Sequence, residues 1–250
     1  MRSIILKSIP MVTTMANPPP VITIESGRRL YRVLKREYDT AGNRRYTALD
    51  PNPYPNLDWI NDIRALYSDG EAVAGRFSPF RSNGVSVAAL YLAPTPETGY
   101  LEMVLRPSGN MAPRTLSIHE FTSLEVATVS FEDELKLADC RENYLKGGSD
   151  EYWAHSKDEL FSARQLKCQD SARTLAKFIY ENFEYLDGLV WDSIQHGNIV
   201  PVYMLFGDRR DGEIHHSIMA LDDIPTWRPY LRLFEKSDNL VIAPDLAAIL

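Results

Sequence analysis

Cysteine, basic charge and long hydrophobic runs are all scarce in this sequence of 250 residues. The 2 cysteines, Cys140 and Cys168, are too few for a disulfide scaffold and lack the CxxC spacing of zinc sites. Lys and Arg number 27 against 34 Asp and Glu, a net charge of −7, which argues against a nucleic-acid-binding protein. No apolar run reaches the roughly 18 residues that a transmembrane helix needs. We therefore expect a cytoplasmic protein that binds neither nucleic acid nor membranes directly.

Common catalytic and phosphate-binding motifs are also missing. The sequence has no GxGxxG after an apolar strand, no GxxxxGK[ST], no GxSxG and no HExxH. His215 and His216 are neighbours, and neighbouring side chains on a strand point to opposite faces, so joint metal ligation is not expected. We expect this pair to lie in a surface turn, and we expect no metal site.

One long folded region follows a short N-terminal leader. The apolar run at 4–6 is too short for a signal peptide, and three prolines at 18–20 form a stiff, extended stretch. We expect residues 1–20 to be a disordered leader and residues 21–250 to form one domain. Within that domain, residues 38–74 are interpreted as an insertion, because their first part is rich in Asn, Asp, Pro and Tyr.

Apolar periodicity and turn signals predict a mixture of strands and helices. Thr95 can cap a helix that Pro96 opens, Asp170 can cap a second helix, and Asp187 with Gly188 is typical of a turn. We expect strands at 21–24, 30–33, 85–92, 189–191, 200–206 and 240–242, further strands within 116–130, and helices at 59–66, 95–105 and 170–183. Because strands and helices do not alternate regularly, the predicted fold class is α+β.

Acidic residues are concentrated in one segment. Residues 120–159 contain 11 acidic and 4 basic residues, a balance of −7 that equals the charge of the whole chain. Such a segment usually forms a solvated face, and we expect one here rather than an acidic binding site.

Three short segments place polar side chains in apolar surroundings. Arg32 lies inside an apolar strand in the most basic part of the chain, where the alternative is an outward-facing arginine. Glu102 is flanked by apolar residues, so it is either partly buried at a cleft or reaches solvent from a helix. Ser193 ends a short apolar strand, a position that is often only a hydrogen-bonded strand terminus.

The order and spacing of these segments resemble the RES domain, a family named for its Arg, Glu and Ser. The matching text is LYRV at 30–33, GRF at 75–77, ALYLAPTPETGYLE at 89–102 and LDGLVWDS at 186–193. The helix expected at 171–183 also looks like the one that precedes the serine strand in that family. The resemblance covers roughly residues 28 to 210, and this chain is longer than ordinary members of the family.

The resemblance implies a single α+β domain with a mixed β core like that of ADP-ribosyltransferases, flanked by helices. RES domains are the toxins of bacterial toxin–antitoxin pairs, and they degrade NAD by phosphorolysis or hydrolysis. NAD would then be a substrate, inorganic phosphate a co-substrate of phosphorolysis, and no cofactor is implied. The implied partner is an antitoxin with an Xre-like DNA-binding region, and formation of a homo-oligomer stays open.

The resemblance also assigns roles to residues of this chain. It implies three catalytic residues, Glu102, Arg32 and Ser193, of which the carboxylate would stabilise positive charge on the ribose. It implies three substrate-binding residues, Arg76, Tyr91 and Tyr31, with the arginines suited to the diphosphate. Two alternatives stay open: transfer of ADP-ribose to a protein acceptor, and a non-enzymatic interaction domain on a degenerate RES fold.

Overall fold

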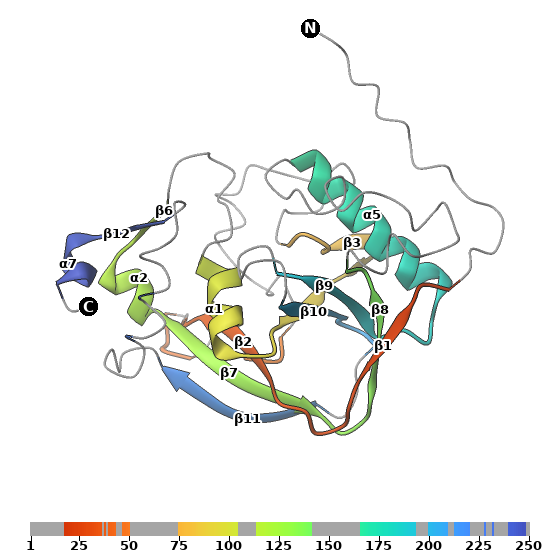
Figure 1. Ribbon diagram of the computed structural model, residues 1–250, viewed down its shortest axis with the longest axis horizontal. Coiled ribbons are helices and arrows are strands. Elements are labelled where there is room, and N and C mark those ends of the chain that lie inside the picture. The colour runs from red at the N-terminus through yellow and green to blue at the C-terminus, as the bar shows by residue number, and fades with distance from the viewer. Residues whose placement is uncertain are drawn as a thin grey trace, which may run out of the picture.

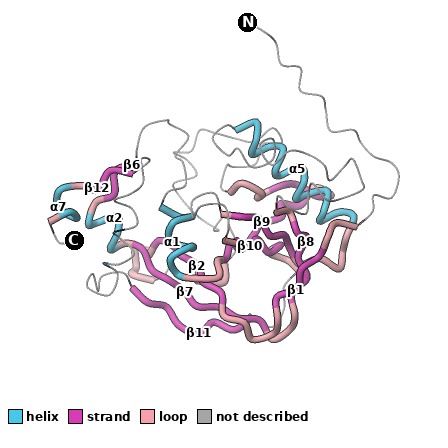
Figure 2. Tube along the Cα trace, in the orientation of Figure 1, coloured by secondary structure: helices cyan, strands magenta, loops and turns pink. Residues whose placement is uncertain are grey.

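The computed structural model of the chain has an α+β fold, as the sequence predicts (Figures 1 and 2). The strands form a five-stranded sheet, a three-stranded sheet and two pairs, and four helices lie among the described residues. None of these helices is long and apolar enough to cross a membrane. The structure describes residues 18–36, 38, 40–43, 47–50, 75–104, 114–141, 166–193, 200–209, 213–220, 228, 232 and 240–248.

The five-stranded sheet is the centre of the fold. In spatial order it contains β1 (Val21–Ile24), β8 (Leu135–Asp139), β9 (Gly188–Asp192), β10 (Pro201–Phe206) and β5 (Ala89–Leu92). Only β8 and β9 run parallel within this sheet. Both faces are covered by apolar side chains, so β9 and β10 read as continuous apolar runs rather than alternating ones.

Helix α5 (Leu166–Asn182) covers one face of this sheet (Figure 1). Ala172, Leu175, Ala176 and Ile179 repeat at helical spacing, and all four are buried against the sheet. The predicted apolar face is therefore confirmed, but the predicted start is wrong. Asp170 lies inside the helix, which begins four residues earlier, at Leu166.

The opposite face of the five-stranded sheet packs on the three-stranded sheet. That sheet has the order β11 (Glu213–Ala220), β7 (Leu124–Phe131), β2 (Leu30–Lys35), with antiparallel pairing throughout. His215 and His216 lie within β11, beside a shift in the pairing register, so the prediction of a surface turn is wrong. Tyr31 and Ala93 link the two sheets, since each backbone N–H donates to the other's carbonyl at 2.8 Å.

Helix α1 (Pro96–Val104) follows directly after this link. Its predicted N-terminus is confirmed: the Thr98 backbone N–H donates to Thr95 Oγ1 at 3.1 Å, as expected for a capping threonine. Gly99 faces Val33 of β2 and Ala93, where a Cβ would make ordinary van der Waals contacts, so the helix packs directly on the sheet at this position.

Residues 85–92, for which the sequence predicts one strand, form two strands. β4 (Val85–Val87) pairs with β3 (Phe80–Ser82) in a hairpin, whereas β5 begins after Ala88 and joins the central sheet. Asn83 and Gly84 connect the hairpin with φ values of 50° and 80°, the left-handed region that Asn and Gly tolerate best.

A second, smaller group lies at the other end of the molecule (Figure 1). It contains β6 (Arg114–Leu116), β12 (Leu240–Ile242), α2 (Ile118–Thr122) and α7 (Pro244–Ala247), with β6 and β12 parallel. Helix α2 interrupts the region 116–130, where only strands were expected. A capping box explains its start: Ser117 Oγ accepts from the Glu120 N–H, and the Glu120 carboxylate accepts from the Ser117 N–H.

The acidic segment is not simply a solvated face. Loop residues 132–134 are exposed as expected, but Glu125 and Asp139 are buried, at 3% and 1% exposure. Asp139 forms a two-pronged ion pair with Arg141, and Glu125 lies 3.8 Å from Arg36. The expectation of a solvated face is therefore wrong for both residues. Each carboxylate lies beside an arginine, and burial without such a partner would be very costly.

Several predictions fall outside the described residues. They concern residues 1–17 of the leader, most of the insertion at 38–74 and the helix at 59–66. The described chain includes Pro20, whose carbonyl accepts from the Asp139 N–H at 2.7 Å. The boundaries of leader and domain stay predictions.

Gly188 opens β9 instead of forming the predicted turn, which lies at Glu184 and Tyr185. A Cβ at Gly188 would lie 2.9 Å from Leu205 Cα on the paired strand and would also collide with the Met204 carbonyl. We predict that Gly188→Ala lowers the free energy of unfolding by about 3 kcal/mol or more, since paired backbones cannot move apart cheaply. Thermal denaturation measures this as a fall in Tm of roughly 6–12 °C.

Gly27→Ala is the control for this substitution. Gly27 has a φ of 72° but nothing within 4 Å of its Cβ position, so alanine there adds backbone strain without a collision. A Gly188→Ala protein that is as stable as Gly27→Ala would contradict the close approach of β9 and β10.

Candidate active site

The fold brings Glu102 and Ser193 together. Glu102 lies on α1, Ser193 directly follows β9, and the serine hydroxyl donates a hydrogen bond to Glu102 Oε1 across 91 positions of sequence. Ser193 is fully buried and Glu102 is half-buried. The Ser193 backbone N–H donates to the Val200 carbonyl at 2.8 Å, which fixes the serine beside the start of β10. A carboxylate is thus held by a hydroxyl at the end of the central sheet.

An aromatic cluster lies on the face of the sheet that α5 covers. It consists of Phe77, Tyr91 of β5 and Trp191 of β9, with ring centroids 4.8 Å apart for Phe77 and Trp191 and 6.1 Å apart for Tyr91 and Trp191. Ser193 continues the pairing of β9 with β10 one position beyond Asp192, since its N–H donates to the Val200 carbonyl, so its side chain lies on the same side as that of Trp191, two positions earlier. The cluster and the Glu102–Ser193 pair therefore lie along the same side of β9.

Tyr91 holds the segment that carries Arg76. Its hydroxyl accepts a hydrogen bond from the Phe77 backbone N–H at 3.1 Å and shares one with Ser78 Oγ at 3.0 Å. Gly75 lies directly against the Tyr91 phenol, where a Cβ would collide with the hydroxyl. The predicted GRF segment therefore depends on its glycine for close approach, and the Tyr91 hydroxyl fixes the backbone on which half-buried Arg76 sits.

Arg32 is buried, at 3% exposure, and so is not the outward-facing strand arginine that the sequence left open. Its Nη1 donates to the carbonyl oxygens of Ala48 at 2.6 Å and Asp50 at 2.5 Å. These bonds tie the turn at 47–50 to β2. Tyr31 is half-buried next to Arg32, with its backbone bonded to Ala93.

The predicted residues thus fall into three groups. Glu102 contacts Ser193, Tyr91 contacts the backbone around Arg76, and the described hydrogen bonds of Arg32 lead to the turn at 47–50. Sequence reasoning missed Trp191, which connects the first two groups through its place on β9. The signal was present, because Trp191 stands two positions before the serine in the quoted LDGLVWDS text.

The described His, Cys, Asp and Glu side chains include one buried cysteine, Cys140. No group of three or more His, Cys, Asp or Glu side chains in the described part of the chain could hold a metal ion. Cys140 is fully buried, and burial, together with the neighbouring Asp139 charge, raises the pKa of its thiol well above the usual value. A thiol in that state is a poor nucleophile.

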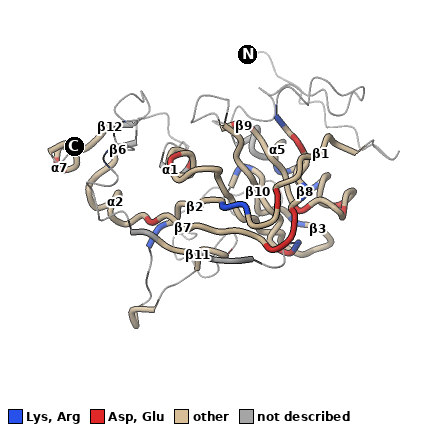
Figure 3. Tube along the Cα trace, turned by 60° about the horizontal axis from the view of Figure 1, so that its bottom comes forward, with Lys and Arg blue, Asp and Glu red and all other residues tan. Residues whose placement is uncertain are grey.

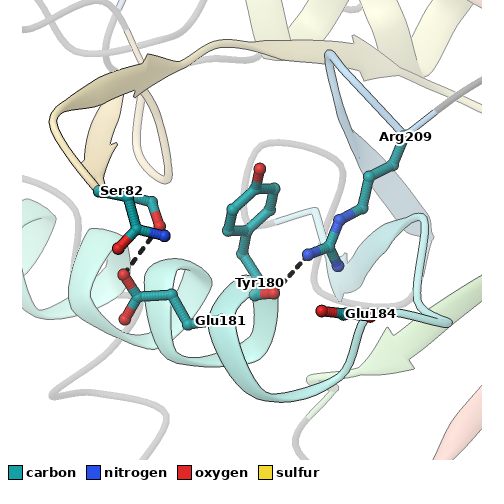
Figure 4. Close-up of a pocket in the computed structure, with 6 residues that line it drawn as sticks. Ser82, Tyr180, Glu181, Glu184 and Arg209 are labelled. Carbon is teal, nitrogen blue, oxygen red and sulfur yellow. Dashed lines mark hydrogen bonds between the residues drawn. The ribbon is translucent and has the colours of Figure 1, made fainter.

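An open polar pocket lies elsewhere, at the C-terminal end of α5 (Figure 4). It is lined by Ser82, Asn83, Tyr180, Glu181, Glu184 and Arg209, none of which the sequence singles out. Arg209 donates to the carbonyl oxygens of Tyr180, Phe183 and Leu186 and lies 3.9 Å from the Tyr180 ring centroid. These contacts satisfy the Tyr180 carbonyl in the last turn of α5 and two carbonyls of the turn that follows it, which is a structural role.

Comparison with known proteins identifies one family. The family model described as RES domain matches residues 29–228. This range includes all six predicted site residues and Trp191. No curated protein matches the sequence.

The Tyr91 hydroxyl generates a testable expectation for stability. We predict that Tyr91→Phe lowers the free energy of unfolding by about 1–3 kcal/mol, because the Phe77 N–H loses its acceptor in a largely buried place. Urea denaturation of the two proteins measures the difference.

Tyr185→Phe is the matched control, since Tyr185 is 50% exposed and its substitution should leave the stability within about 0.5 kcal/mol. Equal stability of the Tyr91 and Tyr185 variants would show that the hydroxyl does not hold the Gly75–Phe77 segment.

Proposed function

Because the chain belongs to the RES domain family of toxin–antitoxin systems, we propose that it is a toxin-type enzyme that cleaves the bond between nicotinamide and ribose in NAD. The observation that carries this proposal is the hydrogen bond from Ser193 to Glu102. It joins a carboxylate and a hydroxyl from distant parts of the chain, at the residues for which the resemblance implies catalytic roles.

The proposed reaction needs one well-placed carboxylate. When the C1′–N bond of NAD breaks, its electron pair leaves with nicotinamide, which departs neutral and needs no general acid. Positive charge develops on the ribose, and Glu102 stabilises it. An oxygen of phosphate, or of water that then loses a proton, forms the new bond to C1′. The Ser193 hydroxyl holds the carboxylate in position and is not itself a nucleophile.

The arginines have different parts in this proposal. Arg76 binds the diphosphate, because its planar guanidinium can donate several hydrogen bonds at once and Tyr91 fixes its backbone. Arg32 secures the turn at 47–50 through two carbonyl oxygens, and its role in the reaction stays a prediction. Tyr31 is proposed to contact the substrate from the adjoining position on β2.

The proposed partner is an Xre-type antitoxin whose carboxylates exclude NAD. Arg28 and Arg29 are exposed just before β2 and could receive acidic groups. Arg36, by contrast, is already close to buried Glu125. The acidic loop at 132–134 also lies next to Arg28 and Arg29 (Figure 3). Just before them in the chain, Ser26 donates to the Glu132 carbonyl at 2.6 Å and the Gly27 N–H donates to the Phe131 carbonyl at 2.9 Å. A partner must therefore approach a surface that carries both signs of charge.

Removal of the carboxylate charge tests the proposal directly. We predict that Glu102→Gln lowers NAD turnover by at least about a hundredfold, because the glutamine cannot stabilise positive charge on the ribose. The assay incubates purified protein with NAD, with and without phosphate, and identifies the products by mass spectrometry. Expression of wild-type protein in a bacterium should also stop growth and lower NAD, and the Glu102→Gln protein should do neither.

Glu97→Gln is the matched control, since Glu97 lies in the first turn of the same helix and has no part in the proposed chemistry. Normal turnover in folded Glu102→Gln protein would remove Glu102 from the mechanism. A mass gain on protein in place of small ADP-ribose products would favour ADP-ribosyl transfer.

Arg76 generates a separate expectation for binding. We predict that Arg76→Lys weakens NAD binding about tenfold, since lysine keeps the charge but loses the planar, multi-donor group. Calorimetry on the Glu102→Gln background measures affinity without turnover. Arg81→Lys serves as the control, because Arg81 is exposed on β3 and has no proposed contact with NAD. Unchanged affinity in the Arg76→Lys protein would exclude the phosphate contact.

A further inference from the structure

The indole of Trp191 has a buried polar atom without a partner. The side chain is 4% exposed, and its Nε1 has no hydrogen-bond partner within the part of the chain that the structure describes. Most buried donors in proteins are paired, and an unpaired one costs about 1–3 kcal/mol. An unpaired donor in this cluster is therefore suited to an acceptor that a bound ligand supplies.

The neighbours of the indole do not supply that acceptor. Phe77 contributes only an apolar ring at a centroid distance of 4.8 Å. Tyr91 is the nearest polar ring of the cluster, and its hydroxyl is already bonded to the Phe77 N–H and to Ser78 Oγ. The apolar surroundings are suited to a flat aromatic ring with one polar substituent.

Trp191 lies two positions before Ser193, the residue that holds the proposed catalytic carboxylate of Glu102. Two residues along an extended chain span about 7 Å, and Ser193 directly follows β9 with its N–H bonded to the Val200 carbonyl. The alternation of side chains therefore places Trp191 and Ser193 on the same side of the sheet. Ser193 in turn donates to Glu102, which we propose to act at C1′ of the ribose. A nicotinamide ring bonded to that carbon would lie near the end of β9, the strand that carries the indole.

We propose that Trp191 binds the nicotinamide group of NAD, with its indole N–H donating a hydrogen bond to the carboxamide oxygen. This inference rests on the proposed function. The indole N–H is only a donor, so it selects an acceptor, and the carboxamide oxygen is the acceptor on the ring that leaves. The N–H is closed to solvent, so this mode of binding requires the aromatic cluster to rearrange until the carboxamide oxygen reaches the donor.

The test removes the N–H while keeping the shape of the ring. Trp191 is replaced by 3-benzothienylalanine, which has sulfur in place of N–H, and in a second variant by phenylalanine. Each protein is assayed with three substrates: NAD, its 3-acetylpyridine analogue and its thionicotinamide analogue. The 3-acetylpyridine analogue keeps the carbonyl oxygen. In the thionicotinamide analogue a weakly accepting sulfur replaces that oxygen. We expect kcat/KM to fall about tenfold for the first two substrates and by less than about twofold for the third.

The pattern across substrates separates a hydrogen bond from packing. Ratios between substrates do not depend on how much protein is folded, so the phenylalanine variant is informative even if it is less stable. Phe77→Leu is the matched control: it disturbs the same cluster without removing a side-chain donor and should affect all three substrates equally. Equal losses for all three substrates in both Trp191 variants, or no loss, would overturn the inference. Failure of the wild-type protein to cleave any of them would instead overturn the proposed function.

Discussion

Two backbone hydrogen bonds between Tyr31 and Ala93 determine where the rest of the site can lie. They join β2 of the smaller sheet to the chain leaving β5 of the central sheet, so both sheets share one fixed junction. Helix α1 starts immediately beyond that junction and packs on β2 through Gly99. Glu102 lies on this helix, and its position relative to β9 is therefore set by main-chain geometry. Ser193 then needs only to follow the end of β9 to meet the carboxylate.

Local signals in the sequence predicted the elements that carry the site. Thr95 and Pro96 marked the start of α1, and short apolar runs marked β2, β9 and β10, because capping and strand burial depend on neighbouring residues. The split between β4 and β5 was missed, since Ala88 carries no turn signal and only the different pairing partners separate the strands. The start of α5 was placed too late for a related reason: Asp170 can cap a helix but is equally tolerated within one.

The pairing of residues across the fold could be predicted only in part. The ordered motifs suggested that Glu102 and Ser193 act together, and the structure adds the hydrogen bond between them. The apolar strand around Arg32 left burial and outward exposure both open, because its carbonyl acceptors belong to a turn of irregular sequence that local signals do not pair with it. The charge pattern likewise marks Glu125 only as one of several acidic residues in its segment, although its side chain is buried and lies 3.8 Å from Arg36. Such partners are defined by packing, which a charge pattern along the chain does not contain.

The strand order of the central sheet also sets when the site can first exist during synthesis on the ribosome. β10 lies between β9 and β5, so Ser193 has no fixed place relative to α1 until the chain has been made through Phe206. Contacts this distant in sequence form late in folding, after the intervening chain has closed on itself. A nascent chain that already carries Glu102, Arg32 and Arg76 therefore lacks the assembled site. In a domain of the toxin type, the proposed site would therefore be complete only in chains that extend through β10.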